Sequence, residues 1–151
     1  MESHDLIRKA IPGDEHAILD LIKELATYEK EPDAVINTPN QLAVDLFEDK
    51  VCDCFVYIHK SKIIGIALYY LSYSTWKGRC IYLEDIYVQP DFRRLGAGSK
   101  LFKKVVNEAE RIGVKRMDWQ VLEWNELALS FYKKVGAHLD NEWVNGRLFF
   151  E

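Results

Sequence analysis

The sequence has few of the features that mark secreted, membrane-spanning or disulfide-bonded proteins. Its three cysteines, Cys52, Cys54 and Cys80, do not form a disulfide framework. Cys52 and Cys54, with His59 nearby, lack the ligand count of a zinc site. No apolar run reaches the roughly 18 residues that a membrane span needs, and the polar N-terminus lacks the apolar core of a signal peptide. We therefore expect reduced structural thiols in a cytoplasmic protein.

Positive charge is also scarce. The chain has 20 lysines and arginines against 24 acidic residues, a formal net charge of −4. Proteins that bind nucleic acid usually carry a basic stripe, so this balance argues against a nucleic-acid partner. It is compatible with a cationic substrate, although net charge does not locate a site. The length of 151 residues and the hydrophobic content of 48% predict a single domain over residues 1–151 with a full core.

Hydrophobic periodicity predicts strands and helices in a mixed order. Strands are expected over residues 6–10, 54–59, 63–71, 80–88, 116–122, 137–139 and 146–150. Helices are expected over about 14–28, 39–47, 96–112 and 126–135. Residues 54–71 are typical of an antiparallel hairpin, in which Gly65 marks a bulge or a close backbone approach. The strand–helix–strand order over 80–122 predicts two parallel strands joined by a right-handed crossover.

The stretch from residue 81 to 99 carries the clearest chemical signal. It is predicted to form a strand, then a turn with Arg93, Arg94, Gly96 and Gly98, then the start of a helix. N–H groups at a helix start have no partner inside the helix and favour an anion, and glycines let the backbone approach a ligand. Neither a Walker loop nor the dinucleotide fingerprint fits this order of residues. We interpret the turn as a cradle for pyrophosphate, with a purely structural glycine turn as the alternative.

Two adjacent carboxylates, Glu84 and Asp85, interrupt the apolar strand before this turn. A carboxylate in a buried strand is costly unless it is paired or needed. Side chains alternate along a strand, so Glu84, Ile86 and Val88 should share one face, and Asp85 and Tyr87 the other, unless a bulge breaks the phase. Core packing does not explain the two carboxylates, and an internal salt-bridged pair is the structural alternative.

The order of elements, the pattern Arg93-x-x-Gly96-x-Gly98 and the late segment from Asn125 to Gly136 resemble a GNAT acetyltransferase domain over the whole chain. The resemblance implies an α/β fold, in which a central mixed sheet is flanked by about four helices. Residues 21–29, 82–85 and 123–126 resemble the spermidine/spermine (diamine) acetyltransferase subgroup, and residues 73–88 its thialysine N-epsilon-acetyltransferase branch. Ser74 stands where the polyamine branch has an aspartate. That departure favours thialysine, lysine-like amines or short diamines over spermidine as the acceptor.

This resemblance implies direct transfer of an acetyl group from acetyl-coenzyme A (acetyl-CoA) to a primary amine in a ternary complex, with neither a metal nor a covalent enzyme intermediate. Glu84 is expected to accept the proton of the amine, and Tyr132 to protonate the leaving thiolate. The expected coenzyme-binding residues are Ile86, Tyr87, Val88, Arg93, Arg94, Leu95, Gly96, Ala97, Gly98, Ser99, Asn125, Glu126, Leu127 and Ala128. The expected amine-binding residues are Tyr28, Glu29, Trp76, Glu84, Asp85 and Glu142.

The resemblance also implies a homodimer that completes the acceptor site between subunits, and no membrane partner. Structural alternatives stay open for three more of these residues: Glu29 as a solvated charge at the helix end, Trp76 as a lid over the core and Tyr132 as a core tyrosine. Two other functions stay open as well. In the first, the acceptor is a protein lysine or N-terminus, and an open peptide groove is expected. In the second, the chain is a regulatory domain that binds acetyl-CoA without turnover.

Overall fold

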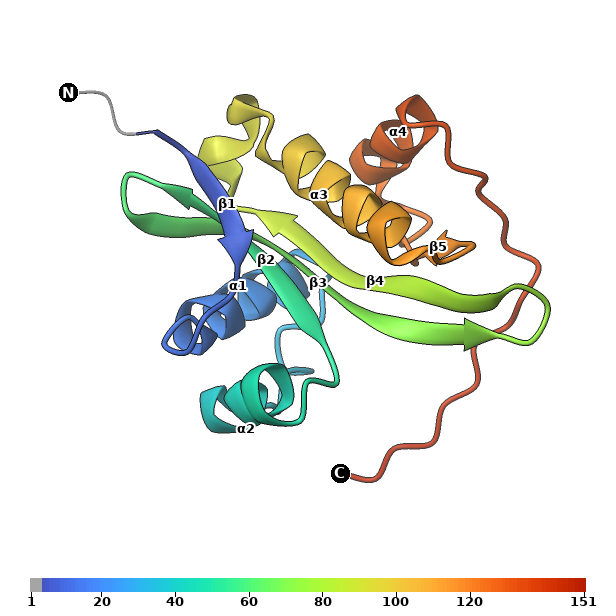
Figure 1. Cartoon of the computed structure of the whole chain (residues 1–151), viewed down its shortest axis with the longest axis horizontal. Helices are drawn as coiled ribbons and strands as arrows, with labels where there is room; N and C mark the ends of the chain where they lie inside the picture. Colours follow the sequence, from blue (N-terminus) through green and yellow to red (C-terminus); the bar gives the residue numbers. More distant parts are fainter. Residues whose placement is uncertain (1–3) are drawn as a thin grey trace. The chain divides into compact units, whose positions relative to one another are not determined.

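The computed structural model of the chain describes residues 4–151, which divide into two compact units, one up to Gln120 and the other Val121–Glu151. The first unit contains a five-stranded mixed sheet in the order β1-β2-β3-β4-β5 (Figure 1). Its strands are β1 (Leu6–Lys9), β2 (Asp53–His59), β3 (Lys62–Ser74), β4 (Gly78–Val88) and β5 (Met117–Asp118). Strands β1 to β4 pair antiparallel with their neighbours, and β5 runs parallel to β4. The mixed sheet and its parallel pair are therefore as predicted.

Helices cover both faces of this sheet. On one face lie α1 (Glu15–Tyr28) and α2 (Pro39–Ala43), which continues as a π-helical turn over Val44–Glu48; α3 (Ala97–Ile112) covers the other face (Figure 1). The fully buried residues on the α1 side include Ile18 and Leu21, and those of α3 include Leu101 and Val105, as the helical spacing predicts. The second unit contains α4 (Glu126–Lys134). Among residues 4–151, no helix is both long and apolar enough to cross a membrane.

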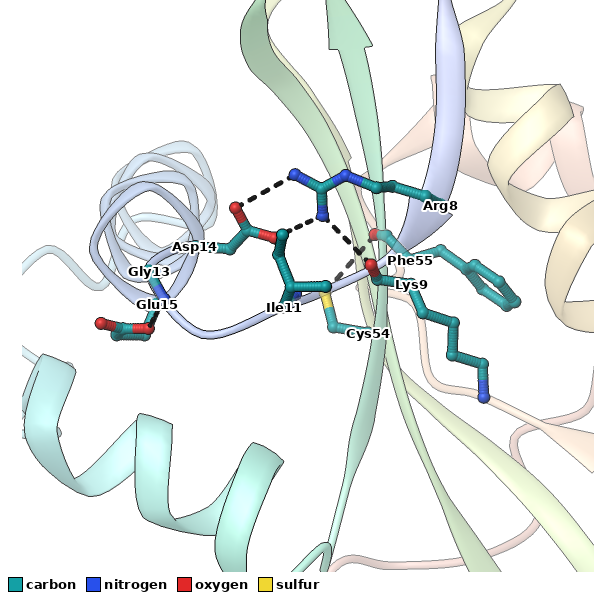
Figure 2. Close-up of polar contacts among 8 residues, drawn as sticks. All are labelled: Arg8, Lys9, Ile11, Gly13, Asp14, Glu15, Cys54 and Phe55. Atoms are coloured by element: carbon teal, nitrogen blue, oxygen red, sulfur yellow. Dashed lines mark hydrogen bonds and ion pairs between the residues drawn. The ribbon is translucent and has the colours of Figure 1, made fainter.

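The start of α1 is fixed to β1 by Asp14, the residue before the helix (Figure 2). Its carboxylate accepts a hydrogen bond from Nη1 of Arg8 at 2.6 Å and from the N–H of Ile11 at 2.9 Å. Burial opposes ionisation of Asp14, but these hydrogen bonds prevail and lower its pKa. The N–H of Gly13 donates to Glu15 at 2.7 Å. These contacts set where α1 begins, and hence where its last turn lies.

Gly65 of β3 packs closely against both the neighbouring strand β4 and helix α3. A Cβ atom added there would be 3.1 Å from Cδ1 of Leu101, 3.2 Å from Cγ2 of Val88 and 3.3 Å from the carbonyl oxygen of Tyr87. Gly65 also adjoins a bulge, because it pairs with Tyr57 while Ile58 pairs with Ile63. Both features that the sequence predicted for Gly65 are confirmed.

Replacing Gly65 by alanine is expected to lower the free energy of unfolding by about 1–3 kcal/mol, because packed side chains and a backbone carbonyl must shift to admit the methyl group. Urea unfolding measures the change. Gly146→Ala is the matched control, since a Cβ at Gly146 meets open space. Equal stability of the two variants would show that this close approach does not limit packing.

Several predicted boundaries were wrong. β3 continues to Ser74 and β4 begins at Gly78, so both strands extend beyond the predicted 63–71 and 80–88 and are joined by a tight turn. β5 covers two residues and not 116–122. The strands expected over 137–139 and 146–150 are not formed within the described residues, where Val144 and Phe150 are 97% and 94% exposed. A strand needs a neighbour for its N–H and C=O groups, and the described chain pairs none with this segment.

Candidate active site

The glycine turn takes a conformation suited to an anion. A short 3-10 helix, η2 (Pro90–Leu95), follows β4 and leads to Gly96, whose φ of +71° lies in the left-handed region. Residues other than glycine rarely adopt this backbone conformation. A Cβ atom added to Gly96 would have no atom of a non-neighbouring residue within 4 Å. α3 then starts at Ala97. Its first N–H groups lack partners within the helix and so are available to a phosphate.

The edge of β4 beside this turn is open. β5 pairs only with Ile81 and Tyr82. From Leu83 to Val88, β4 therefore has no strand partner on this side among the described residues, although it pairs fully with β3 on the other. Alternate backbone groups on such an edge can bind an extended ligand as a further strand would. The residues predicted to contact the arm of the coenzyme, Ile86 to Val88, lie on this open edge.

A bulge in β4 sets the directions of Glu84 and Asp85. Leu83 pairs with Tyr69 and Asp85 with Leu68, so Glu84 is the extra residue on its strand. Bulges break the alternation of side chains and redirect them. Glu84 is exposed, whereas Asp85 is half-buried. The strict alternation that the sequence predicted for Glu84 therefore fails at this point, and Tyr87 keeps the α1 side, where it joins the core.

Three carboxylates lie close enough to affect one another. Burial, followed by the charges of Glu84 and Glu29, raises the pKa of Asp85 to about 7. Burial and the charge of Glu84 also raise the pKa of Glu29, the residue that ends α1. We call Glu29, Glu84 and Asp85 the acidic cluster. Mutual repulsion of this kind is relieved by a bound cation, so the cluster is suited to an ammonium group.

The structural alternative for the two carboxylates of β4, an internal salt-bridged pair, is not what the structure shows. No lysine, arginine or histidine forms an ion pair with Glu29, Glu84 or Asp85 among the described residues. The acidic cluster therefore keeps its charge available for a ligand.

Other predicted residues fall in different places. Tyr28, at the end of α1, lies under the guanidinium of Arg93, with 5.6 Å between the guanidinium carbon and the ring centroid. Trp76 is 83% exposed in the turn between β3 and β4. There Ser74 Oγ accepts hydrogen bonds from the N–H groups of Trp76 and Lys77, at 3.2 and 3.1 Å. Ser74 is thus engaged in holding this turn.

The remaining predicted residues belong to the second unit. Asn125 caps α4, since its side-chain oxygen accepts a hydrogen bond from the N–H of Ala128 at 3.2 Å. Tyr132 is 5% exposed, and Glu142 is exposed in the irregular segment after α4. Glu126 and Leu127 are the first two residues of α4, and both are exposed. The roles predicted for these residues stay predictions.

Two residues near the acidic cluster and the turn were missed. Tyr70 lies close enough to Glu84 for that charge, after burial, to raise its pKa, and it stacks on Tyr82 at 5.3 Å. Nothing in the long apolar run of β3 marks Tyr70 from sequence. Glu24 contacts Tyr87 and Gln89. The sequence contained a signal for Glu24, because it stands four residues before Tyr28 and therefore lies on the same face of the helix.

Comparison with known proteins tests the resemblance. The acetyltransferase (GNAT) family model matches residues 16–137. The chain is 45% identical over 141 residues to the thialysine N-epsilon-acetyltransferase of Bos taurus, which covers 87% of this chain and 83% of that protein. It is 36% identical over 124 residues to the enzyme of that name from Caenorhabditis elegans, covering 82% and 77%.

A solved structure agrees with the fold. An aminoglycoside acetyltransferase from an uncultured soil metagenomic sample, in complex with trehalose, superposes with a TM-score of 0.80 at 19% identity and 97% coverage of both chains. This likeness concerns the fold alone, and it confirms the predicted α/β architecture. The relatives confirm the resemblance to the thialysine branch. The chain therefore belongs to the acetyltransferase (GNAT) family and is an acetyl-CoA-dependent amine N-acetyltransferase.

Proposed function

We propose that this enzyme acetylates the primary amine of a small cationic substrate, namely thialysine, a lysine-like amine or a short diamine or polyamine. The acidic cluster beside the open edge of β4 is the observation that supports this choice. Burial and like charge raise the pKa of Asp85 and of Glu29, and an ammonium ion would offset both repulsion and lost hydration. The relatives named for thialysine support the same class of acceptor.

The residues of the first unit fit acetyl-CoA, which supplies a thioester acetyl group when bound. The left-handed Gly96 and the start of α3 would hold its pyrophosphate, together with Arg93, Arg94 and the backbone up to Ser99. The open edge from Ile86 to Val88 would hold its extended arm. One N–H on this edge would polarise the thioester carbonyl, which is an oxyanion-hole role. We expect direct transfer in a ternary complex.

Proton handling follows from the amine. An alkyl ammonium has a pKa of about 10.4, so it must lose a proton before it attacks at neutral pH. Glu84 is the exposed member of the acidic cluster and is proposed to accept that proton, directly or through one water. Tyr132 is proposed to protonate the thiolate that leaves.

Replacing Tyr132 by phenylalanine is expected to slow transfer by about 10²-fold while the affinity for the coenzyme stays nearly unchanged, because only the hydroxyl group that donates the proton is lost. Steady-state kinetics give the turnover, and calorimetric titration with coenzyme A gives the affinity. Equal losses in rate and affinity would show that Tyr132 has a structural role.

A homodimer would explain the position of Trp76. Ser74 pairs with Gly78, six residues before Glu84 on β4. At roughly 3.3 Å per residue, the turn carrying Trp76 lies about 20 Å from Glu84 along the strand. A short amine does not span that distance, so we propose that Trp76 serves the acceptor site of a second subunit. Light scattering that gives the mass of one chain at micromolar concentration would exclude this.

Thiol release from acetyl-CoA tests the proposed function. The panel is thialysine, lysine, putrescine, spermidine and a basic peptide. We expect thialysine or another short amine to be preferred. Strong turnover of spermidine would keep the enzyme class and contradict the inference from Ser74. Activity on the peptide alone would transfer the assignment to a protein acceptor, and no activity on any member would overturn the proposed substrate class.

A further inference from the structure

One face of α1 contacts the turn that is proposed to hold the pyrophosphate of the coenzyme, at Gln89 and at Arg93. Glu24 and Tyr28 are four residues apart, so their side chains lie one above the other on the helix. Glu24 contacts the end of β4, and Tyr28 contacts Arg93 beyond it. The same last turn of α1 leads to Glu29 of the acidic cluster. The helix therefore joins the predicted coenzyme site to the predicted amine site.

Glu24 uses both carboxylate oxygens at the end of β4. Oε1 accepts a hydrogen bond from the hydroxyl of Tyr87 at 3.1 Å, and Oε2 accepts one from Nε2 of Gln89 at 3.0 Å. The backbone of Gln89 is fixed as well: its N–H donates to the carbonyl of Ile64 at 2.9 Å, and its carbonyl accepts from Phe92 at 3.0 Å. Gln89 is thus the first residue of the turn, and its side chain is bound to α1. Hydrogen bonds to a charged group are the stronger class.

Arg93 makes the second connection. Its Nε donates to the carbonyl of Val88 at 3.3 Å, while its guanidinium lies over the ring of Tyr28 at 5.6 Å. The terminal nitrogens of Arg93 make no hydrogen bond with any residue from 4 to 151. A guanidinium has five N–H donors. Arg93 can therefore bind a phosphate and keep its contact with Tyr28 at the same time.

We propose that Glu24 and Arg93 are positioning residues that couple coenzyme binding to amine binding. A pyrophosphate bound in the turn reduces the motion of Arg93 and Gln89. Through their contacts, these two residues reduce the motion of Tyr28 and Glu24 on α1. The last turn of α1 then holds Tyr28 and Glu29 in place for the ammonium group, so the amine binds more tightly once the coenzyme is present. By thermodynamic linkage the amine tightens the coenzyme by the same factor. This inference rests on the proposed function of the acidic cluster.

The coupling is measured as a ratio of dissociation constants. Calorimetry gives the Kd of thialysine for the full chain alone and for the chain saturated with coenzyme A, which carries no acetyl group and does not react. We expect the Kd to fall on the order of tenfold with coenzyme in the wild type. Glu24→Leu removes both hydrogen bonds, and the ratio should approach one. Glu24→Gln keeps an oxygen for Tyr87 and should restore part of the ratio.

The control is Asp20→Asn, an exposed carboxylate on the same helix, which should keep the full ratio. Should Glu24→Leu not fold, Arg93→Gln removes the contact with Tyr28 and is expected to lower the ratio too. Thialysine binding with a wild-type ratio of one would overturn the coupling and leave the proposed function standing. A Glu24→Leu variant with lower Tm but a full ratio would also overturn it. Failure of thialysine, lysine and putrescine to bind at all would overturn the proposed function itself.

Discussion

Replacing Glu84 by glutamine is expected to lower the rate of acetyl transfer by about 10³-fold at pH 7. At that pH only about one alkyl amine in 10³ is unprotonated. With Glu84 the enzyme binds the ammonium form and removes its proton at the site. Without Glu84 the reaction depends on the small fraction of free amine. The deficit should therefore shrink by about tenfold for each unit of pH and become small near pH 10.

The measurement is a pH–rate profile from about pH 6 to 10, taken at saturating acetyl-CoA with the preferred amine of the panel. Glu110→Gln is the matched control, because Glu110 is an exposed glutamate on α3, away from the acidic cluster. Its profile should follow the wild type. A Glu84→Gln profile that is lowered equally at every pH would assign Glu84 to binding and exclude its role as a base. If a water molecule replaces the carboxylate, the loss of rate relative to the wild type should be smaller but should change with pH in the same way.

Local features of the site could be predicted from the sequence, because they depend on residues that are close along the chain. The turn at Gly96 and the start of α3 at Ala97 lie where the sequence predicted a glycine turn and a helix start. An apolar run located β4, and the strand–helix–strand order predicted that β5 runs parallel to it. Even Gly65 was marked, since a glycine within a strand signals a bulge or a close approach.

Features that depend on pairing between strands could not be predicted. The bulge at Glu84 exists because Leu83 pairs with Tyr69 and Asp85 with Leu68, a register that no local pattern fixes. Tyr70 enters the surroundings of Glu84 through the same register. The apolar residues in 146–150 predicted a strand, but a strand also needs a neighbour to pair with, and local sequence does not supply one.

Glu24 shows a third case. Glu24 lies in the helix that was predicted over 14–28, and its spacing from Tyr28 puts both side chains on one face, although no role was predicted for it. Yet its partners, Tyr87 and Gln89, are more than sixty residues away in sequence. The helix and the spacing can therefore be read from the sequence, whereas only the structure shows what this side of α1 contacts.

Replacing Asp85 by asparagine is expected to stabilise the protein above pH 7 and to have little effect near pH 4. The pKa of Asp85 is about 7 in the folded protein, against 3.8 as its ordinary value. Between these two values the unfolded chain has released the proton that the folded chain still holds, so wild-type stability falls as pH rises. The loss is about 1.4 kcal/mol for each unit of pH, or about 4 kcal/mol by pH 7. Asparagine does not ionise and escapes this loss.

Urea unfolding at several pH values measures the difference. The stability of Asp85→Asn minus that of the wild type should grow from near zero at about pH 4 to about 3–4 kcal/mol at about pH 8. Asp33→Asn is the control, since Asp33 is exposed in the loop after α1 and should show no such slope. A difference that does not change with pH would mean that Asp85 ionises normally in the folded protein.

The same substitution should weaken the binding of the amine above pH 7. There the ionised Asp85 of the wild type is destabilised by burial and by Glu84 and Glu29, and an ammonium ion relieves this. Thialysine should therefore raise the stability of the wild type at about pH 8 more than that of Asp85→Asn. A variant that gains stability and keeps full amine affinity would show that the ammonium group binds elsewhere. A gain in stability with a loss of amine affinity would show that the carboxylate of Asp85 serves ligand binding and lowers the stability of the folded protein.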